Sequence, residues 1–470
     1  MPRVTSLSRF AFAVSGVPTV GIISNGVDYF LFFFYSQLLG LSASLTGLAL
    51  AIALACDALA DPVIGYLSDN WESRWGRRHP FMYAAIVPVT ALYVLIWFPP
   101  AGASSQWALF GYLLTVAVLL RLSMTMFDMP VQTLVAELTS DYDERTDLAS
   151  LPTTVSWVTS SVMTIAMYAY WLRNTADHIN GQLNTAGYQQ AALVSGVVVL
   201  ASLILSSVGL HPEIPRLPGR TAEQAAGLKD MFRSFVQLLR NRSMRALLAA
   251  SLFLAAGLGV DATLWLYQYS AFYGMSSNQM LALTVVQLIA TFAVVPVVRN
   301  YVVKGDKKVM AIRFLVASVA ISIILPPLHV LKLLPGSGSN GLMCLLLVYD
   351  FLSQLIWIVA TAIIYSMYAD VTDELLLVVG KRMEGALFAC QTFISKGAAA
   401  LGALLAGALL TVIQYPVASD TAGVSDKILA RLGISYTVSW LVLASIGIWL
   451  ISQYQITRAS HAAEVRTLVG

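Results

Sequence analysis

Charged residues are scarce in this chain of 470 residues, in which Asp, Glu, Lys and Arg together make up 11%. Ordinary soluble domains carry about 25%. With 58% hydrophobic residues and a mean hydropathy of +0.74, the chain cannot cover a soluble surface with charge. This composition excludes a soluble enzyme and a disordered chain. The net charge of only +3 also argues against a basic nucleic-acid-binding surface.

Residues that carry most metal and redox chemistry are rare as well. The three cysteines lie in apolar runs without a pairing pattern, which predicts neither disulfides nor a metal cluster. The five histidines are scattered over loops and ends, which argues against a membrane-embedded enzyme built on a His/Asp or Cys/His cluster. No glycine-rich phosphate loop is visible, so ATP-driven chemistry is not expected. We therefore expect neither an enzyme nor a resident cofactor.

Long apolar stretches are what the sequence does contain. A membrane-spanning helix needs about 20 apolar residues, and the gaps between charged residues supply this length repeatedly. The pattern predicts an all-α membrane protein with twelve transmembrane helices. The predicted spans are residues 16–39, 44–67, 80–98, 106–130, 150–172, 190–210, 244–270, 278–299, 309–330, 342–368, 385–413 and 434–456.

One polar stretch interrupts this series after the sixth span. Residues 211–243 begin with PEIPRLPGR, typical of a linker, and continue as an amphipathic surface helix. The predicted organisation is a six-helix half over residues 1–210, a cytoplasmic middle loop over 211–243 and a second six-helix half over 244–470. This layout resembles that of major facilitator transporters, which are built from two repeated halves.

The basic residues predict the orientation of the chain in the membrane. Most of the 28 Lys and Arg residues fall on the side of the two termini and the middle loop. Cytoplasmic loops carry such an excess of positive charge. We therefore expect both termini in the cytoplasm, in a membrane of the bacterial inner-membrane type.

Ionisable residues inside the predicted spans are costly and mark functional candidates. Asp57 and Asp61 lie four residues apart, on one face of the second span. Two carboxylates this close repel each other unless a cation or a proton lies between them. Pro62 frees the carbonyl group of Ala58 as a further oxygen ligand. The pair is either a cation-coupling site or a helix contact neutralised by Lys396 or Arg121.

The fourth span places more polar groups on one face. Asp128 lies one turn after Thr125 and two turns after Arg121. Arg121 is either a counter-charge for an anionic substrate or one partner of a structural ion pair. Lys396, on the eleventh span, is either an internal cation that exchanges with a coupling ion or a structural residue.

Other charges at membrane depth are weaker candidates. Asp28 and Asp261 could face a substrate cavity from the first and seventh spans, and Tyr29 could stack on a substrate ring. Asp350 is expected near a helix end, where a structural role is favoured. Glu384 completes the set of intramembrane charges.

Three ordered blocks resemble one known family. Residues 57–81 (DALADPVIGYLSDNWESRWGRRHPF) are similar to the second span and following loop of the glycoside–pentoside–hexuronide:cation symporters. That family includes the melibiose permeases and belongs to the major facilitator superfamily. Residues 125–152 and 368–403 resemble the end of its fourth span and its tenth-to-eleventh-span segment.

The resemblance implies a binding site for sodium, lithium or a proton. Its ligands would be Asp57, Asp61, Asp128 and Thr125, with Lys396 nearby, and with Na+ as the ion the three carboxylates would be metal ligands. The resemblance also assigns a cytoplasmic gate to the loop after the second span. Asp69 would pair there with basic residues across the two halves. The residues of this gate are Gly65, Asp69, Arg74, Arg77 and Arg78.

The substrate is not carried over from the family. Gly21 stands where melibiose permeases have an acidic residue, and Thr153 where they have an arginine. We therefore expect cation-coupled symport of a sugar, glycoside or uronide by alternating access. The alternative is a cation-coupled carrier of a lysolipid or another amphiphilic anion, with Arg121 facing the head group. The expected partners are the small-molecule substrate, the cation and the bilayer, without nucleic acid, and the expected state is a monomer.

Overall fold

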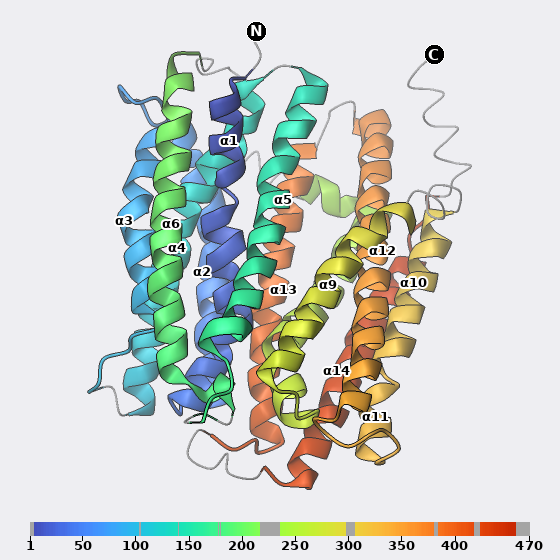
Figure 1. Ribbon diagram of the computed structural model, residues 1–470. Helices are drawn as coiled ribbons and strands as arrows, with labels where there is room; N and C mark the ends of the chain where they lie inside the picture. The colour runs from blue at the N-terminus through green and yellow to red at the C-terminus, as the bar shows by residue number, and fades with distance from the viewer. Residues whose placement is uncertain are drawn as a thin grey trace. The chain divides into compact units, whose positions relative to one another are not determined.

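The computed structural model describes residues 4–102, 105–139, 141–176, 178, 180–216, 236–297, 306–379, 384–417 and 424–456. These residues form helices joined by short loops, without a β-strand among them (Figure 1). By its internal contacts the chain divides into two compact units. The first contains residues 1–228 and 416–422, and the second residues 229–415 and 423–470.

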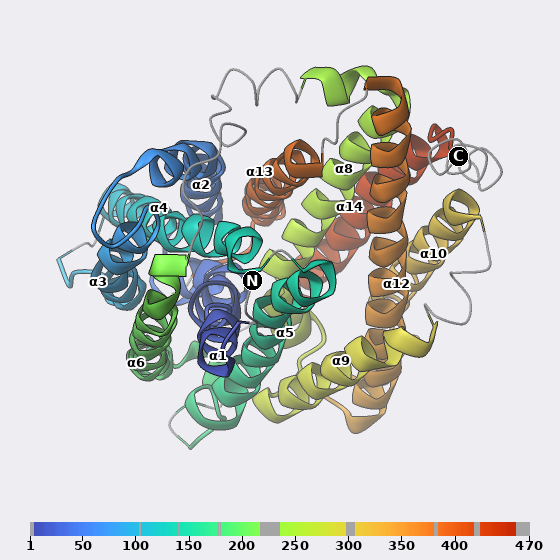
Figure 2. The same cartoon turned by 90° about the horizontal axis from the view of Figure 1, so that it is seen from above.

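The first unit is a bundle in which α2 packs on α4, and α3 lies between α4 and α6. Helix α1 contacts both α5 and α6, and Figure 2 shows these helices from above. Its elements are α1 (Ser6–Val14), η1 (Val17–Ser24), η2 (Gly26–Leu31), η3 (Phe34–Leu38), α2 (Ala43–Asn70), α3 (His79–Leu95), α4 (Gln106–Leu138), α5 (Tyr142–Ala166), η4 (Met167–Trp171), η5 (Gly181–Leu183), α6 (Thr185–Leu210) and η6 (His211–Arg216).

The second unit is arranged around α8, which packs on both α13 and α14. Helix α12 contacts α9 and α10, and a cluster of buried apolar side chains that includes Leu247, Ala360 and Met367 fills the space between the helices. Its elements are α8 (Arg242–Leu266), η8 (Tyr267–Phe272), α9 (Ser277–Val297), α10 (Lys307–Ser322), α11 (Leu325–Val330), α12 (Asn340–Val379), α13 (Glu384–Val412) and α14 (Asp426–Ser452).

Short polar side chains set the starting points of several helices. Ser105 accepts a hydrogen bond from the backbone N–H of Ala108 at the start of α4, over 3.1 Å. Asp141 accepts one from Glu144 at the start of α5, over 2.9 Å. Such N-caps satisfy backbone donors that have no partner within the helix. The loops that precede these helices therefore fix where each one enters the bundle.

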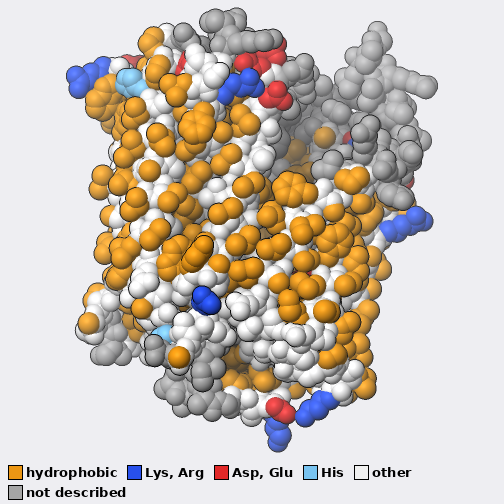
Figure 3. Space-filling view, viewed as in Figure 1, with side chains coloured by type: hydrophobic (Ala, Val, Ile, Leu, Met, Phe, Trp, Pro, Cys, Tyr) orange, Lys and Arg blue, Asp and Glu red, His pale blue; other side chains and the backbone are white. Residues whose placement is uncertain are grey.

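Ten of the described helical segments are long and apolar enough to cross a membrane. Helix α3 is a shorter apolar helix, and α5 covers most of the remaining predicted span. Many large apolar side chains on these helices face outward, as expected for contact with lipid, and Leu59 is 63% and Val87 is 70% exposed. Figure 3 shows apolar side chains along the sides of the helices, with most visible charges near their ends. The helical membrane fold expected from the sequence is confirmed.

The ends of several predicted spans need correction. The first span does not begin at residue 16, because helical structure starts at Ser6 and continues through wide π-helical turns to Leu38. Helix α12 continues to Val379, well beyond the predicted end at residue 368. The hydropathy pattern detects only the apolar segment of this helix. The polar residues after residue 368 continue the helix beyond that segment, so the predicted end was too early. The predicted amphipathic helix of the middle loop lies mostly outside the described residues, although residues 236–240 are helical.

Small residues allow two pairs of neighbouring elements to approach closely. A Cβ atom added at Gly16, before η1, would lie 2.1 Å from the carbonyl oxygen of Pro152 on α5. One added at Gly402 on α13 would lie 2.6 Å from the Cα atom of Gly259 on α8. Close packing through small residues is typical of helices in membranes, where apolar burial does not drive association between helices.

Candidate functional site

The two carboxylates of the second span meet a hydroxyl group from the fourth. The Thr125 hydroxyl, on α4, donates to Oδ1 of Asp57 over 2.6 Å and lies 3.4 Å from Oδ1 of Asp61. Thr125 is 2% exposed and Asp57 is 4% exposed. The packing of α2 on α4 therefore brings together three of the oxygen-bearing side chains that the sequence analysis selected.

The local sequence explains why this part of α2 presents oxygen atoms. Asp57 and Asp61 are four residues apart, so their side chains lie on one face of the helix. Pro62 lies inside α2 and has no N–H group to donate to the carbonyl of Ala58. That carbonyl is one turn before the proline, so it adds an acceptor to a segment that already holds two carboxylates.

Two further residues, Asp128 and Lys396, belong to the predicted cation site. Asp128 is half-buried on α4, one turn after Thr125. Among the described residues no group of three or more His, Cys, Asp or Glu side chains is placed to hold a metal ion. Lys396 lies on α13, in the second unit. The roles of Asp128 as a third carboxylate ligand and of Lys396 as a neighbour therefore stay predictions.

Arg121 forms an ion pair with an acidic residue of the first span. Its guanidinium group lies 2.9 Å from Oδ1 of Asp28, and the two side chains are 10% and 45% exposed, respectively. The carbonyl oxygen of Arg121 also accepts from the Thr125 hydroxyl over 3.2 Å. Of the two interpretations of Arg121, the geometry matches the ion pair. Tyr29, next to Asp28 on η2, is 41% exposed, and its role in substrate stacking stays a prediction.

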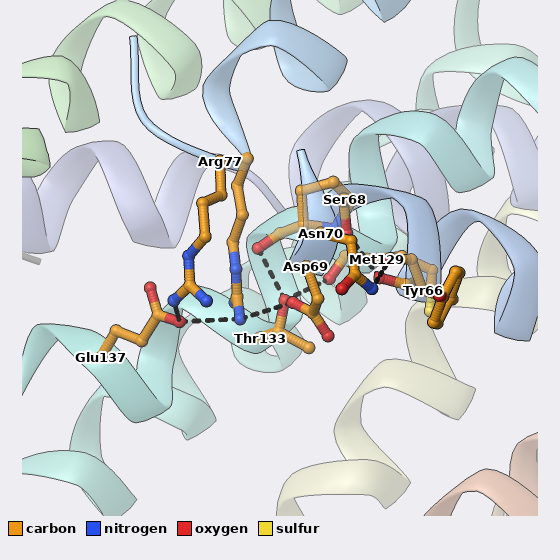
Figure 4. A network of polar contacts seen from close by, with 11 residues as sticks. Tyr66, Ser68, Asp69, Asn70, Arg77, Met129, Thr133 and Glu137 are labelled. Atoms are coloured by element: carbon orange, nitrogen blue, oxygen red, sulfur yellow. Dashed lines mark hydrogen bonds and ion pairs between the residues drawn. The ribbon is translucent and has the colours of Figure 1, made fainter. Parts of the chain in front are cut away.

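The loop after α2 carries a compact arginine–carboxylate network of Asp69, Arg77, Arg78 and Glu137 (Figure 4). Arg78 lies 3.0 Å from Asp69 and 2.8 Å from Glu137, and Arg77 lies 2.6 Å from the same Glu137 oxygen. Burial lowers the pKa of Arg78 and raises that of Glu137, while the nearby opposite charges act against both shifts. The described partner of Asp69 is Arg78, which belongs to the same unit, and the pairing of Asp69 across the two halves stays a prediction.

Glu137 is a member of this network that the sequence analysis missed. It lies within the block 125–152 that resembles the known family, and it occupies the last turn of α4. A lone acid at the end of an apolar helix is an ordinary membrane-boundary residue, so its sequence position alone did not single it out. Only the packing of α4 beside the loop shows that both arginines converge on it.

The other predicted gate residues have simpler surroundings. The guanidinium group of Arg74 lies over the ring of Trp75, 5.1 Å from its centroid. Gly65 on α2 has open space where a side chain would begin. Gly76 has a φ of +75°, a backbone conformation that favours glycine, and it allows the tight turn before the two arginines. Their joint role as a gate stays a prediction.

A lysine–aspartate pair occurs in the second unit. Nζ of Lys307, at the start of α10, lies 2.6 Å from Oδ1 of Asp370 on α12. Asp306 caps α10 by accepting from the backbone N–H of Val309 over 3.2 Å. Residues 304 and 305, which precede Asp306 in the chain, lie outside the described residues.

The remaining acidic candidates lie in the second unit. Asp261 accepts a hydrogen bond from the Tyr436 hydroxyl, and Asp350 accepts one from Tyr269. The expectation that Asp350 lies near a helix end is wrong, because it falls well inside α12 and is 4% exposed. The side chain of Glu384 lies outside the described residues. Both aspartates line one cavity, which is described below.

Residues 12–458 match the family model described as MFS/sugar transport protein. An uncharacterized symporter of a Synechocystis species is 32% identical over 214 residues, which are 44% of this chain and 39% of that protein. The inner membrane symporter YicJ of Escherichia coli is 23% identical over 90% of this chain and 87% of its own. The solved inward-open structure of the xylose transporter XylE from E. coli has a TM-score of 0.58 and 15% identity over 98% of both chains, which shows a shared fold.

Proposed function

This chain belongs to the MFS/sugar transport family, and on that premise we propose that it is a symporter that moves a sugar, glycoside or uronide together with a cation. It is a multi-pass membrane protein with the major facilitator fold. The cation would bind at Asp57, Asp61, Thr125 and Asp128. The observation that carries this proposal is the Thr125 hydroxyl, which lies within 2.6 Å of one buried carboxylate and 3.4 Å of the next.

The chemistry of these side chains suits a small hard cation or a proton. Carboxylate and hydroxyl oxygens are the ligands that hard cations prefer. Two carboxylates one turn apart repel each other, and a cation between them removes that repulsion. Either Na+, Li+ or H+ would meet this need. With Na+ bound, Thr125 would turn its oxygen lone pair toward the ion and its hydrogen elsewhere.

Coupling follows from reciprocal binding. A cation that orders α2 and α4 raises the affinity for the substrate, and the substrate then raises the affinity for the cation by the same factor. Each positive charge that moves inward gains about 2.3 kcal/mol per 100 mV of membrane potential. This gain drives accumulation of a neutral substrate against its gradient.

The alternative cargo, an amphiphilic anion such as a lysolipid, receives less support from the site. The main argument for an anionic cargo was that Arg121 could supply a counter-charge for its head group. That guanidinium group already lies 2.9 Å from Asp28, so an anionic head group would have to displace a carboxylate. The sugar class therefore remains the proposed one.

The arginine–carboxylate network and the termini complete the proposal. We infer that the network, with Gly65 and Arg74, closes the cytoplasmic end of the transport path when the site faces outward. The distribution of basic residues favours a cytoplasmic position for both termini, and the chain would function as a monomer. Fusion of a fluorescent reporter that is active only in the cytoplasm to either terminus tests the orientation. A dark reporter at both ends would contradict it.

Cation binding is tested with the purified full-length protein in detergent, by thermal unfolding at increasing Na+, Li+ or H+ concentration. A ligand that binds the folded state raises its stability in proportion to the logarithm of its concentration. Thr125→Val removes a hydroxyl and preserves shape. A hydrogen bond to a charged group contributes about 1.5–3 kcal/mol, so the cation affinity should fall about tenfold or more. Asp57→Asn should abolish the cation response.

The matched control is Thr133→Val, on the same helix. Thr133 is exposed, and its hydroxyl donates to the carbonyls of Met129 and Pro130 in its own helix. This variant should respond to cations as the wild type does. An equal cation response in the wild type, Thr125→Val and Asp57→Asn would contradict the proposed site.

A further inference from the structure

A polar cavity lies entirely within the second unit. It lies between α8, η8, α9, α10, α12 and α14 and measures about 560 Å³ when the open solvent at its mouth is counted, of which about 90 Å³ is open to the centre of a water molecule. Figure 2 shows these helices from above. The charged residues that line it are Asp261 and Asp350, and none of the described lining residues is basic. The cavity therefore holds two carboxyl groups and no built-in counter-charge among those residues.

Each aspartate is held by a tyrosine. The Tyr436 hydroxyl donates to Asp261, and the Tyr269 hydroxyl donates to Oδ1 of Asp350. Oδ2 of Asp350 is buried and has no hydrogen-bond partner of ordinary geometry among the described residues, although the side-chain amide of Gln287 also donates toward this carboxyl group. A carboxylate oxygen can accept two hydrogen bonds, and an unsatisfied buried acceptor is costly. This oxygen therefore calls for a donor from within the cavity.

A buried donor without a partner lines the same cavity. Nε1 of Trp440, on α14, has no acceptor among the described residues, and the side chain is 7% exposed. An indole N–H can only donate. A proton or a metal cation would satisfy Asp350 and leave Trp440 unpaired. An anion would satisfy Trp440 and be repelled by the two aspartates. A hydroxyl group can donate to the carboxylate and accept from the indole.

The rest of the lining suits a ring that carries several hydroxyl groups. Gln287 and Gln354 offer amides that both donate and accept hydrogen bonds. The rings of Trp357 and Trp440 lie 5.5 Å apart in an edge-to-face arrangement and give the cavity an apolar wall. Sugar rings have apolar C–H faces and polar edges, which match such a mixture of aromatic and hydrogen-bonding groups.

We propose that this cavity binds the hydroxyl groups of a neutral sugar, with Asp350 as acceptor and Trp440 as donor. Asp261 adds a second acceptor on α8. The inference rests on the proposed function for the sugar class and narrows it, since the two carboxylates would repel the acid group of a uronide. The cavity thus selects neutral glycosides over uronides and over anionic lipids.

The test uses purified full-length protein and a panel of D-xylose, lactose, isoprimeverose and D-glucose, with D-glucuronate and choline as charged probes. Thermal unfolding and intrinsic tryptophan fluorescence report binding. At least one neutral sugar should stabilise the protein, and D-glucose should bind better than D-glucuronate. Asp350→Asn and Trp440→Phe should each weaken sugar binding about tenfold or more, because the first removes a charged acceptor at nearly unchanged size and the second removes the indole N–H donor while keeping an aromatic ring.

Matched controls are available on the same helix as Trp440. Trp449→Phe changes an indole that is 62% exposed, and Asp426→Asn changes a carboxylate that is 85% exposed at the start of α14. Both should bind sugar as the wild type does. The proposal is overturned if no neutral sugar of the panel binds, if D-glucuronate or choline binds more tightly, or if Asp350→Asn and Trp440→Phe bind as the wild type does.

The same preparations separate this inference from the proposed function. Cation responses of Asp57→Asn and Thr125→Val report on the site in the first unit alone. If those responses equal that of the wild type while sugar binding depends on Asp350 and Trp440, cation coupling at that site fails and the sugar cavity stands. If the cation response is lost as proposed while both cavity variants bind sugar as the wild type does, the cation site stands and the sugar cavity fails.

Discussion

Replacing Glu137 with glutamine removes the shared negative charge of the arginine–carboxylate network while preserving its size. The side chain is 3% exposed, and its two partners Arg78 and Arg77 are 5% and 16% exposed. Removing one partner of a buried ion pair costs about 3–5 kcal/mol, because the other charge stays buried. Arg77 can turn toward solvent and Arg78 keeps Asp69 at 3.0 Å, so the lower end, about 3 kcal/mol, is expected.

This loss should be visible as a lower unfolding temperature. For domains of 150–250 residues, 1 kcal/mol shifts the midpoint by about 2–4 °C, so Glu137→Gln should unfold about 6–12 °C below the wild type. The measurement is thermal unfolding of the purified protein in detergent. The matched control, Glu72→Gln, changes an exposed acid in the same loop and should leave the midpoint unchanged.

A second variant identifies the cause of the effect. Adding Arg77→Gln to Glu137→Gln removes one of the two uncompensated cations, so it should restore part of the lost stability. The reasoning would be refuted if Glu137→Gln unfolded at the same temperature as Glu72→Gln, or if the second substitution lowered the midpoint further.

Two further predictions concern contacts within single units. Gly402→Ala should destabilise the protein by about 1–3 kcal/mol, because the added methyl group would lie 2.6 Å from Cα of Gly259. Gly397→Ala, on the same helix with open space around it, should be tolerated, and equal unfolding midpoints for the two variants would contradict the packing argument. Asp28→Asn should lower stability by about 1–3 kcal/mol by leaving the Arg121 charge buried without its acid. Adding Arg121→Met should recover much of this loss, and a double variant that unfolds below Asp28→Asn would show that the ion pair is not the cause.

Much of the fold is predictable because the bilayer imposes a simple rule on sequence. Spans must be long and apolar, so the gaps between charges locate most helices directly. The first span shows where this rule fails. Gly16, Pro18 and Gly21 fall in a segment of wide helical turns packed against α5, and hydropathy alone does not register such a backbone.

Some features of the candidate site follow from the sequence of a single helix, whereas others depend on how separate helices pack. The spacing of Asp57 and Asp61 is local, so their shared face follows from helix geometry. Their contact with Thr125 needs α2 and α4 to pack, and the resemblance to a known family supplied that link. Glu137 and Asp350 were missed or misjudged because their partners come from other elements. Neither residue spacing nor hydropathy indicates that the Tyr269 hydroxyl donates to Asp350.

The backbone contact between Gly259 and Gly402 has a mechanical consequence. Helices α8 and α13 touch there without intervening side chains, so a side chain added at either glycine would push the two helices apart. Lys396 lies shortly before this contact on α13, and Asp261 follows it on α8. Any change that widens this contact therefore alters the backbone spacing close to both of these charged residues at once.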